Sequence, residues 1–225
     1  MNSHVCVLGL TQDATAEHEA GHLIVAHIRG QEPYCVLMED KADGTHTGQV
    51  QSRSPIVEGQ EIAHLRMLLA VAVAGILAEI KGLASRHVGE IVRFEPGVRW
   101  GDLFQHLVGG VSNISPPILH LRAKESGKTV DVSSAFSSEY SIAFNNDRQD
   151  IRDHAYSFQE LGEDPLAEAE KAFLETAELL DRPEIWEVVL FAARELINAT
   201  PTLLRRLDGL ALKKILCRID DNLKD

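Results

Sequence analysis

The sequence predicts a mainly α protein of the α+β class, with one or two small β-hairpins and a C-terminal helical bundle. Two long segments, Gln12–Ile28 and Glu58–Lys81, have helical composition and contain no proline. Short β-prone runs lie between them, and glycines and prolines divide the C-terminal third into further helical runs. With 225 residues and 44% hydrophobic content, the chain can bury one substantial core, so we expect a single domain over 1–225.

The two long helices have recognisable ends and different surroundings. Asp13 is the expected N-cap of the first helix, and Gly30 stands where a C-terminal stop is expected. The second helix is apolar on nearly all sides from Leu65 to Ile80, which places it in the core. We expect Gly82 to end it.

Two hairpins are predicted from turn residues between β-prone runs. Tyr34–Glu39 and His46–Ser52 flank the Asp-Gly pair at 43–44, a strong hairpin turn signal. Ile118–Lys124 and Thr129–Phe136 can pair in the same way across a Ser-Gly turn.

These elements divide the domain into three regions. A helix and hairpin region spans 12–82, a proline- and glycine-containing insertion of uncertain structure spans 83–144, and a helical bundle spans 145–219. The helical runs expected in the bundle are Asp147–Leu161, Leu166–Leu180, Glu184–Ala199 and Asp208–Ile219.

Composition excludes several classes of function. The chain has 22 basic and 34 acidic residues, so we expect no nucleic-acid surface. Three scattered cysteines fit neither a disulfide framework nor a thiolate metal site, which favours the cytoplasm. The N-terminal Met1–Leu10 does not have the pattern of a secretory signal. The most apolar run, Met67–Ala78, is well short of the roughly 20 residues of a membrane helix, so no membrane segment is predicted.

The strongest chemical signal is His18-Glu19-Ala20-Gly21-His22, an H-E-x-x-H motif inside the first helix. A spacing of four places both imidazoles on one helix face, where they can share one Zn²⁺ ion. Glu19 is then placed to take a proton from a water on the metal and pass it to a leaving amine. We therefore expect His18 and His22 as metal ligands and Glu19 as the catalytic base.

The segment Thr15–Ala26 resembles the zinc helix of the FtsH-type metallopeptidases, in which H-E-A-G-H is followed by small and apolar residues. Ala74–Glu79 with Lys81-Gly82 loosely resembles a second conserved helix of that family, without its Gly-Arg portion, and Trp186–Val189 resembles its C-terminal helices. The resemblance implies a zincin-like fold and a zinc endopeptidase.

The resemblance also implies that the third zinc ligand is an Asp at the start of a helix. Asp147 is preferred because it opens a good amphipathic helix. Asp102 is the alternative, although Gly109-Gly110 shortens its helix. Glu79 is expected to orient a zinc-bound histidine and is a less favoured third ligand.

No ATPase motor is encoded here, although FtsH-type enzymes unfold their substrates with an AAA+ module. The segment Glu125–Thr129 ends like a phosphate-binding loop, but Arg122 stands where that motif requires glycine. We therefore expect unfolded or short polypeptides as substrates, or a separate AAA+ ATPase as partner. The relatives form hexameric rings, so a homo-oligomer is among the assemblies that the resemblance allows.

Besides a helical interaction domain without a metal, two functions remain open. An exposed edge strand, His46–Ser52, could pair with an extended peptide beside the metal, as an endopeptidase requires. The alternative is a catalytically inactive metallopeptidase-like protein that binds or regulates, which the missing Gly-Arg portion and the insertion favour.

Overall fold

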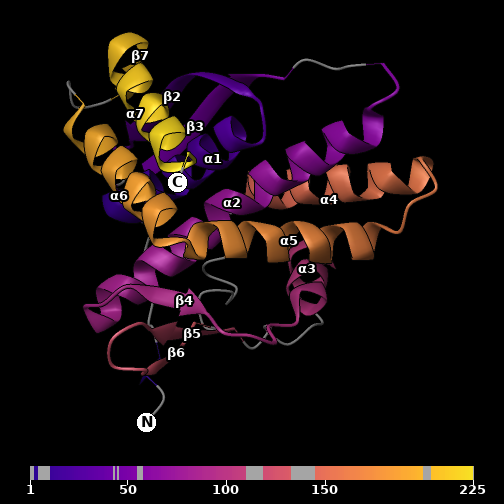
Figure 1. Cartoon of the computed structure of the whole chain (residues 1–225), viewed down its shortest axis with the longest axis horizontal. Helices are drawn as coiled ribbons and strands as arrows, with labels where there is room; N and C mark the ends of the chain where they lie inside the picture. The colour runs from indigo at the N-terminus through magenta and orange to yellow at the C-terminus, as the bar shows by residue number, and fades with distance from the viewer. Residues whose placement is uncertain are drawn as a thin grey trace.

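The computed structural model describes residues 3–4, 11–42, 44, 46–54, 58–109, 119–132, 145–199 and 204–224 (Figure 1). These residues are mostly helical, with two small and largely antiparallel sheets. The helices are α1 (Gln12–Ile28), α2 (Glu61–Val88), α3 (Trp100–Gly109), α4 (Asn145–Glu160), α5 (Pro165–Asp181), α6 (Pro183–Asn198) and α7 (Gly209–Asn222). The strands are β1 (Ser3–His4), β2 (Glu32–Asp40), β3 (His46–Arg53), β4 (Val92–Phe94), β5 (His120–Ala123), β6 (Thr129–Asp131) and β7 (Leu204–Asp208). The mainly α, α+β prediction is confirmed.

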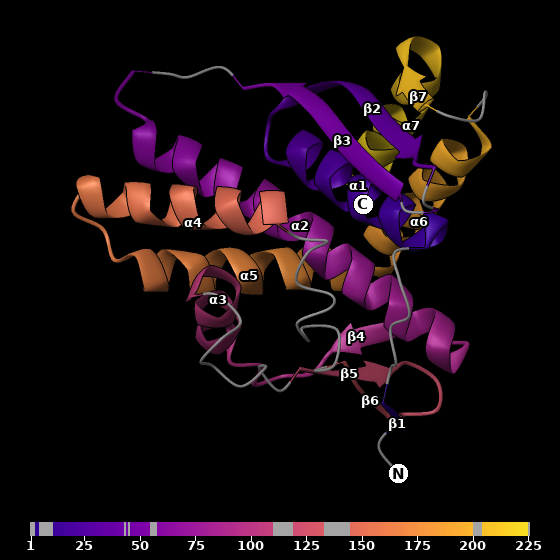
Figure 2. The same cartoon turned by 180° about the vertical axis from the view of Figure 1, so that it is seen from behind.

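Helices α1 and α2 form the centre of the molecule. Figure 2 shows α2 running between α1 with its sheet on one side and α4 with α5 on the other. The two central helices approach closely at Gly21, where an added Cβ would lie 2.6 Å from Ala78 Cβ and 2.7 Å from the Ala74 carbonyl oxygen. The small residues of both helices therefore bring the face of α1 that carries the histidines against α2.

The two central helices differ from the predictions at the cap of the first and at both ends of the second, which begins at Glu61 and not at Glu58. The first helix has its predicted bounds, but Thr11 is its N-cap, because the Thr11 hydroxyl accepts a hydrogen bond from the Ala14 N–H at 3.2 Å. The second helix does not stop at Gly82; it continues to Val88 and ends at Gly89, whose φ of 74° is left-handed. Gly82 instead makes room for the Glu17 side chain, since a Cβ at this position would lie 1.8 Å from Glu17 Oε2.

The first predicted hairpin is confirmed and gains a third strand. Strands β2 and β3 are antiparallel, with Met38 opposite Gly48. Strand β7, which lies where the sequence predicted only helices and a connection, pairs antiparallel with β2 and gives the order β3-β2-β7. Strand β3 is therefore an edge strand of this sheet, and it lies in contact with α1.

The segment 83–144 contributes α3 and most of a second sheet, in the order β1-β6-β5-β4. The predicted hairpin in this segment is confirmed with shorter strands, β5 and β6, joined by a turn at Glu125–Gly127. The residues 133–136 of the predicted second strand lie outside the described residues.

The C-terminal helices pack on one another in order along the chain and also against the two central helices. Helices α4 and α5 pack on α2, while α6 packs on α1 and α7 packs on α6 (Figure 1). Helix α2 is long and apolar enough to cross a membrane by length and composition, but 78% of its most apolar window is buried inside the fold. Burial of this extent is what the central helix of a packed core shows.

Candidate metal centre

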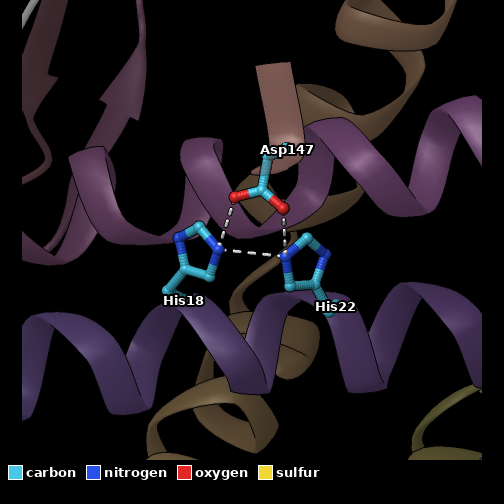
Figure 3. Close-up of side chains that lie close together, drawn as sticks. All are labelled: His18, His22 and Asp147. Atoms are coloured by element: carbon cyan, nitrogen blue, oxygen red, sulfur yellow. Dashed lines mark hydrogen bonds and ion pairs between the residues drawn. The ribbon is translucent and has the colours of Figure 1, made fainter. Parts of the chain in front are cut away.

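Helix α1 presents His18 and His22 toward the same point. Their Nε2 atoms lie 3.0 Å apart, and both side chains are only 11% exposed (Figure 3). The spacing of four residues produces this geometry because it returns to the same helix face after about one turn.

Asp147 completes the cluster from the first turn of α4. Its Oδ2 lies 2.9 Å from His18 Nε2 and its Oδ1 lies 3.4 Å from His22 Nε2 (Figure 3). Ligands at about 2.0–2.1 Å from a tetrahedral zinc ion are separated from each other by roughly 3.3 Å. The separations of the three groups therefore match those of ligands around a single small cation.

Hydrogen bonds on the far side of each ring determine where its lone pair points. His18 Nδ1 lies 3.0 Å from Glu79 Oε2, and His22 Nδ1 lies 2.7 Å from the carbonyl oxygen of Val71. Because both partners are acceptors, each Nδ1 carries a proton and donates it. In the neutral rings both Nε2 lone pairs then face each other and Asp147, an arrangement that a shared cation stabilises.

The charges of the cluster are strongly coupled. Burial lowers the pKa of both histidines, but the carboxylates together, Asp147 with Glu79 at His18 and Asp147 with Glu19 at His22, raise both pKa values above the usual value. Burial raises the pKa of Asp147, and the two histidines overcome this effect and hold that pKa well below its usual range. A proton and a metal ion therefore compete for the same nitrogens, and acid is expected to displace the metal.

A glycine of α2 provides the space at the centre of the cluster. A Cβ at Gly75 would lie 2.3 Å from His22 Nε2 and 2.6 Å from His18 Nε2. A side chain at this position would therefore crowd both of the nitrogens that face Asp147. The donor set, the tautomers and the space left by Gly75 all fit a bound metal.

Glu19 lies beside the cluster under the edge strand. Its side chain is buried, with the residue 4% exposed, and its Oε2 has no hydrogen-bond partner among the described residues. Burial raises the pKa of this carboxyl group above its usual value, although the neighbouring histidines lower it. A buried carboxylate oxygen without a donor is suited to accept a proton from a water beside the metal.

The three acidic residues considered as a third metal ligand lie in different places in the fold. Asp147 joins His18 and His22, as predicted. Glu79 lies behind His18 and orients its ring, which is the first of the two roles considered for it. Asp102 is the rejected candidate: it lies on α3, with its side chain 43% exposed and paired with Arg99 at 3.0 Å.

Sequence reasoning did not identify three contributors to the site. The Val71 carbonyl and Gly75 come from α2, and Gly48 comes from β3 and contacts Glu19. A backbone carbonyl leaves no signal in the sequence. The run of small residues around Gly75 was visible, but only the packing of α2 on α1 shows what this glycine contacts.

No protein-family model matches this chain, and no curated protein matches it. The functional argument therefore rests on the geometry of the His18, His22, Asp147 and Glu19 side chains.

Proposed function

We propose that the protein is a zinc-dependent endopeptidase that hydrolyses unfolded or extended polypeptides, with a zincin-like arrangement similar to that of the FtsH-type peptidases. The observation that carries this proposal is the convergence of His18, His22 and Asp147 on one point beside the Glu19 carboxylate. Two imidazoles and one carboxylate form a donor set typical of catalytic zinc, which leaves a position for water or substrate.

Each residue has a defined task in this proposal. His18, His22 and Asp147 would hold the ion, and Glu79 and the Val71 carbonyl would keep the two rings in the correct tautomer. Zinc, when bound, polarises a peptide carbonyl and lowers the pKa of water to about 7. Glu19 would accept the proton of the attacking water and return it to the amine nitrogen as the peptide bond breaks.

The open edge of β3 supports an extended polypeptide as the substrate. Strand β3 has only one neighbour, β2, among the described strands, so its outer backbone N–H and C=O groups are available to a further strand. Thr47, Gly48 and Gln49 of this strand are exposed, and Gly48 lies against Glu19. A chain that pairs here would pass beside the metal centre, and backbone pairing selects extended chains with little sequence preference.

Glu19→Gln tests the proposal directly. This substitution removes the base but preserves the size of the side chain, so turnover of an unfolded protein such as casein should fall by about 10²–10⁴-fold. Zinc content, measured by elemental analysis, should stay near one ion per chain. Unchanged cleavage by Glu19→Gln contradicts the assignment. A zinc-loaded wild type without any peptidase activity favours the binding or regulatory alternative.

The cellular setting of the activity is part of the same proposal. The chain is expected to act in the cytoplasm, on polypeptides that are already unfolded or that a separate AAA+ ATPase delivers. Adding such an ATPase and ATP to the purified protein should extend cleavage to folded substrates if a motor partner exists.

A further inference from the structure

Strand β3 has one face toward α1, and Gly48 lies in the middle of that face. Residues alternate between the two faces of a strand, so His46, Val50 and Ser52 share the face of Gly48. Val50 packs against the core, and the Ser52 hydroxyl donates a hydrogen bond to the Gln31 side chain just beyond α1. The contacts of its neighbours therefore hold Gly48 at a defined distance from α1.

Gly48 contacts the Glu19 side chain more closely than any other residue type would allow. A Cβ at Gly48 would lie 2.3 Å from Glu19 Cγ, 2.5 Å from Cδ and 2.4 Å from Oε1. The clash would involve the middle of the side chain as well as its end. Gly48 has no left-handed φ, so the backbone conformation does not demand glycine here. The close approach to Glu19 is what requires it.

The other surroundings of Glu19 leave it little freedom to move away. The residue is 4% exposed, and it extends from α1 between the buried positions of that helix. The strand thus limits the carboxylate on one side, and the charges of His18 and His22 act on the same group.

We propose that Gly48 is a positioning residue for Glu19: its missing side chain lets the edge strand hold the carboxylate against the metal cluster. The catalytic meaning of this contact rests on the proposed function. The contact also joins the base to the strand on which a substrate would pair, so both would keep a fixed relative position.

The contact can be measured without any assay of activity. Thermal unfolding of the zinc-reconstituted wild type, Gly48→Ala, Glu19→Ala and the double variant forms a cycle. Gly48→Ala should lower Tm by about 4 °C or more when Glu19 is present, which for a chain of this size is a substantial loss of stability. In the Glu19→Ala background, which lacks the clashing atoms, the same change should leave Tm unchanged or raise it. Equal shifts in both backgrounds overturn the proposal.

The positioning role requires a second measurement. Gly48→Ala should keep one zinc per chain but lower kcat by about 10-fold or more, with KM nearly unchanged. Lys171→Ala, a change at an exposed position on α5, is the control and should alter neither value. A fall of KM and kcat together, or no change in kcat, overturns the positioning role.

A wild type without peptidase activity would refute the proposed function, but the positioning of Glu19 by Gly48 could still be tested. In that case the positioning role is tested in the Co²⁺-substituted proteins. The visible spectrum of Co²⁺, measured against pH, reports the ionisation of a coordinated water that Glu19 would contact. A pH midpoint that moves in Gly48→Ala, but not in Lys171→Ala, supports positioning. Identical midpoints overturn it.

Discussion

Three glycines, through their missing Cβ atoms, determine how closely the groups of the site approach one another. The missing Cβ of Gly75 leaves the space between the imidazoles, and the missing Cβ of Gly48 leaves the space for the Glu19 carboxylate. Gly21 does the same for the approach of α1 to α2. Each of these glycines lies where a methyl group would occupy space that another group needs. The site therefore depends on residues that have no functional group in their side chain.

Gly75→Ala is expected to abolish metal binding without unfolding the protein. The added methyl group would crowd His18 Nε2 and His22 Nε2, at 2.6 and 2.3 Å, while alanine favours the helix by about 1 kcal/mol over glycine. Elemental analysis after reconstitution with zinc should find about one ion in the wild type and little in the variant. A helical circular dichroism spectrum is the control for folding. Retention of a full equivalent of zinc would show that the ion lies elsewhere.

A buried cluster of polar contacts around Lys81 joins several helices and one strand. Lys81 of α2 is completely buried, and its ammonium group donates to the Leu180 carbonyl oxygen at 2.9 Å and pairs with Asp181. Asp181 also accepts a hydrogen bond from the Phe94 N–H at 3.0 Å, and the ammonium lies 5.0 Å from the Trp186 ring. This cluster links α2 to the end of α5, to β4 and to α6.

Lys81→Ala is expected to reduce the free energy of unfolding by about 3–5 kcal/mol, because it leaves the Asp181 carboxylate largely buried without its cation. Urea unfolding measures the change. Lys171→Ala is the matched control: Lys171 is 51% exposed and 3.9 Å from Glu175, so its loss should change stability by less than about 0.5 kcal/mol. Similar small losses for both variants would show that the buried pair contributes little.

The α2–α5 contact should also make stability depend on pH. Arg66 donates to both oxygens of Glu168, at 2.8 and 2.6 Å, and this bond lowers the pKa of Glu168 below its ordinary value of 4.5. A carboxyl group with a lower pKa in the folded state stabilises the fold above its ordinary pKa, and the contribution is lost as the pH falls through the lowered pKa.

Glu168→Gln should therefore cost about 1 kcal/mol at neutral pH and make the decline of stability below about pH 4.5 less steep. Unfolding midpoints in urea between pH 3 and 7 measure this difference. Glu160→Gln, at an exposed position on α4, should follow the wild-type profile. A variant parallel to the wild type at every pH would contradict the linkage.

One continuous core extends through the whole molecule. The largest buried hydrophobic cluster includes residues from Ala16 of α1 to Ile219 of α7, with α2, α3, α4, α5 and α6 between them. The candidate metal centre joins the same parts, since its three side chains lie on α1 and α4 and the groups that contact its histidine rings lie on α2. Helices that share a core and a ligand set should unfold together.

Calorimetry is expected to show one unfolding transition, with equal calorimetric and van't Hoff enthalpies, as the predicted single domain requires. Zinc at about 100 times its dissociation constant should add roughly 2.7 kcal/mol to the free energy of unfolding. Asp147→Ala should lose this zinc-dependent shift, and Asp102→Ala should keep it. Two separate transitions in the wild type would refute the single domain.

The sequence by itself determined the local parts of this protein. The motif at 18–22 places two imidazoles and a carboxylate within one turn of a helix, a geometry that follows from helix periodicity alone. The two long helices, the four C-terminal helical runs and the first hairpin were likewise predictable, whereas α3 was not, because turn residues and hydrophobic spacing act over short distances.

Only the tertiary structure decided the rest. Asp147 and Asp102 both begin helices, and what distinguishes them is the packing of α4 against α2. Gly82 has the sequence features of a helix stop, but in the fold it makes room for Glu17 inside α2, and β7 pairs with a strand far away in the chain. Contacts between distant segments depend on how faces fit together in three dimensions, and periodicity along one segment carries no information about the partner of each face.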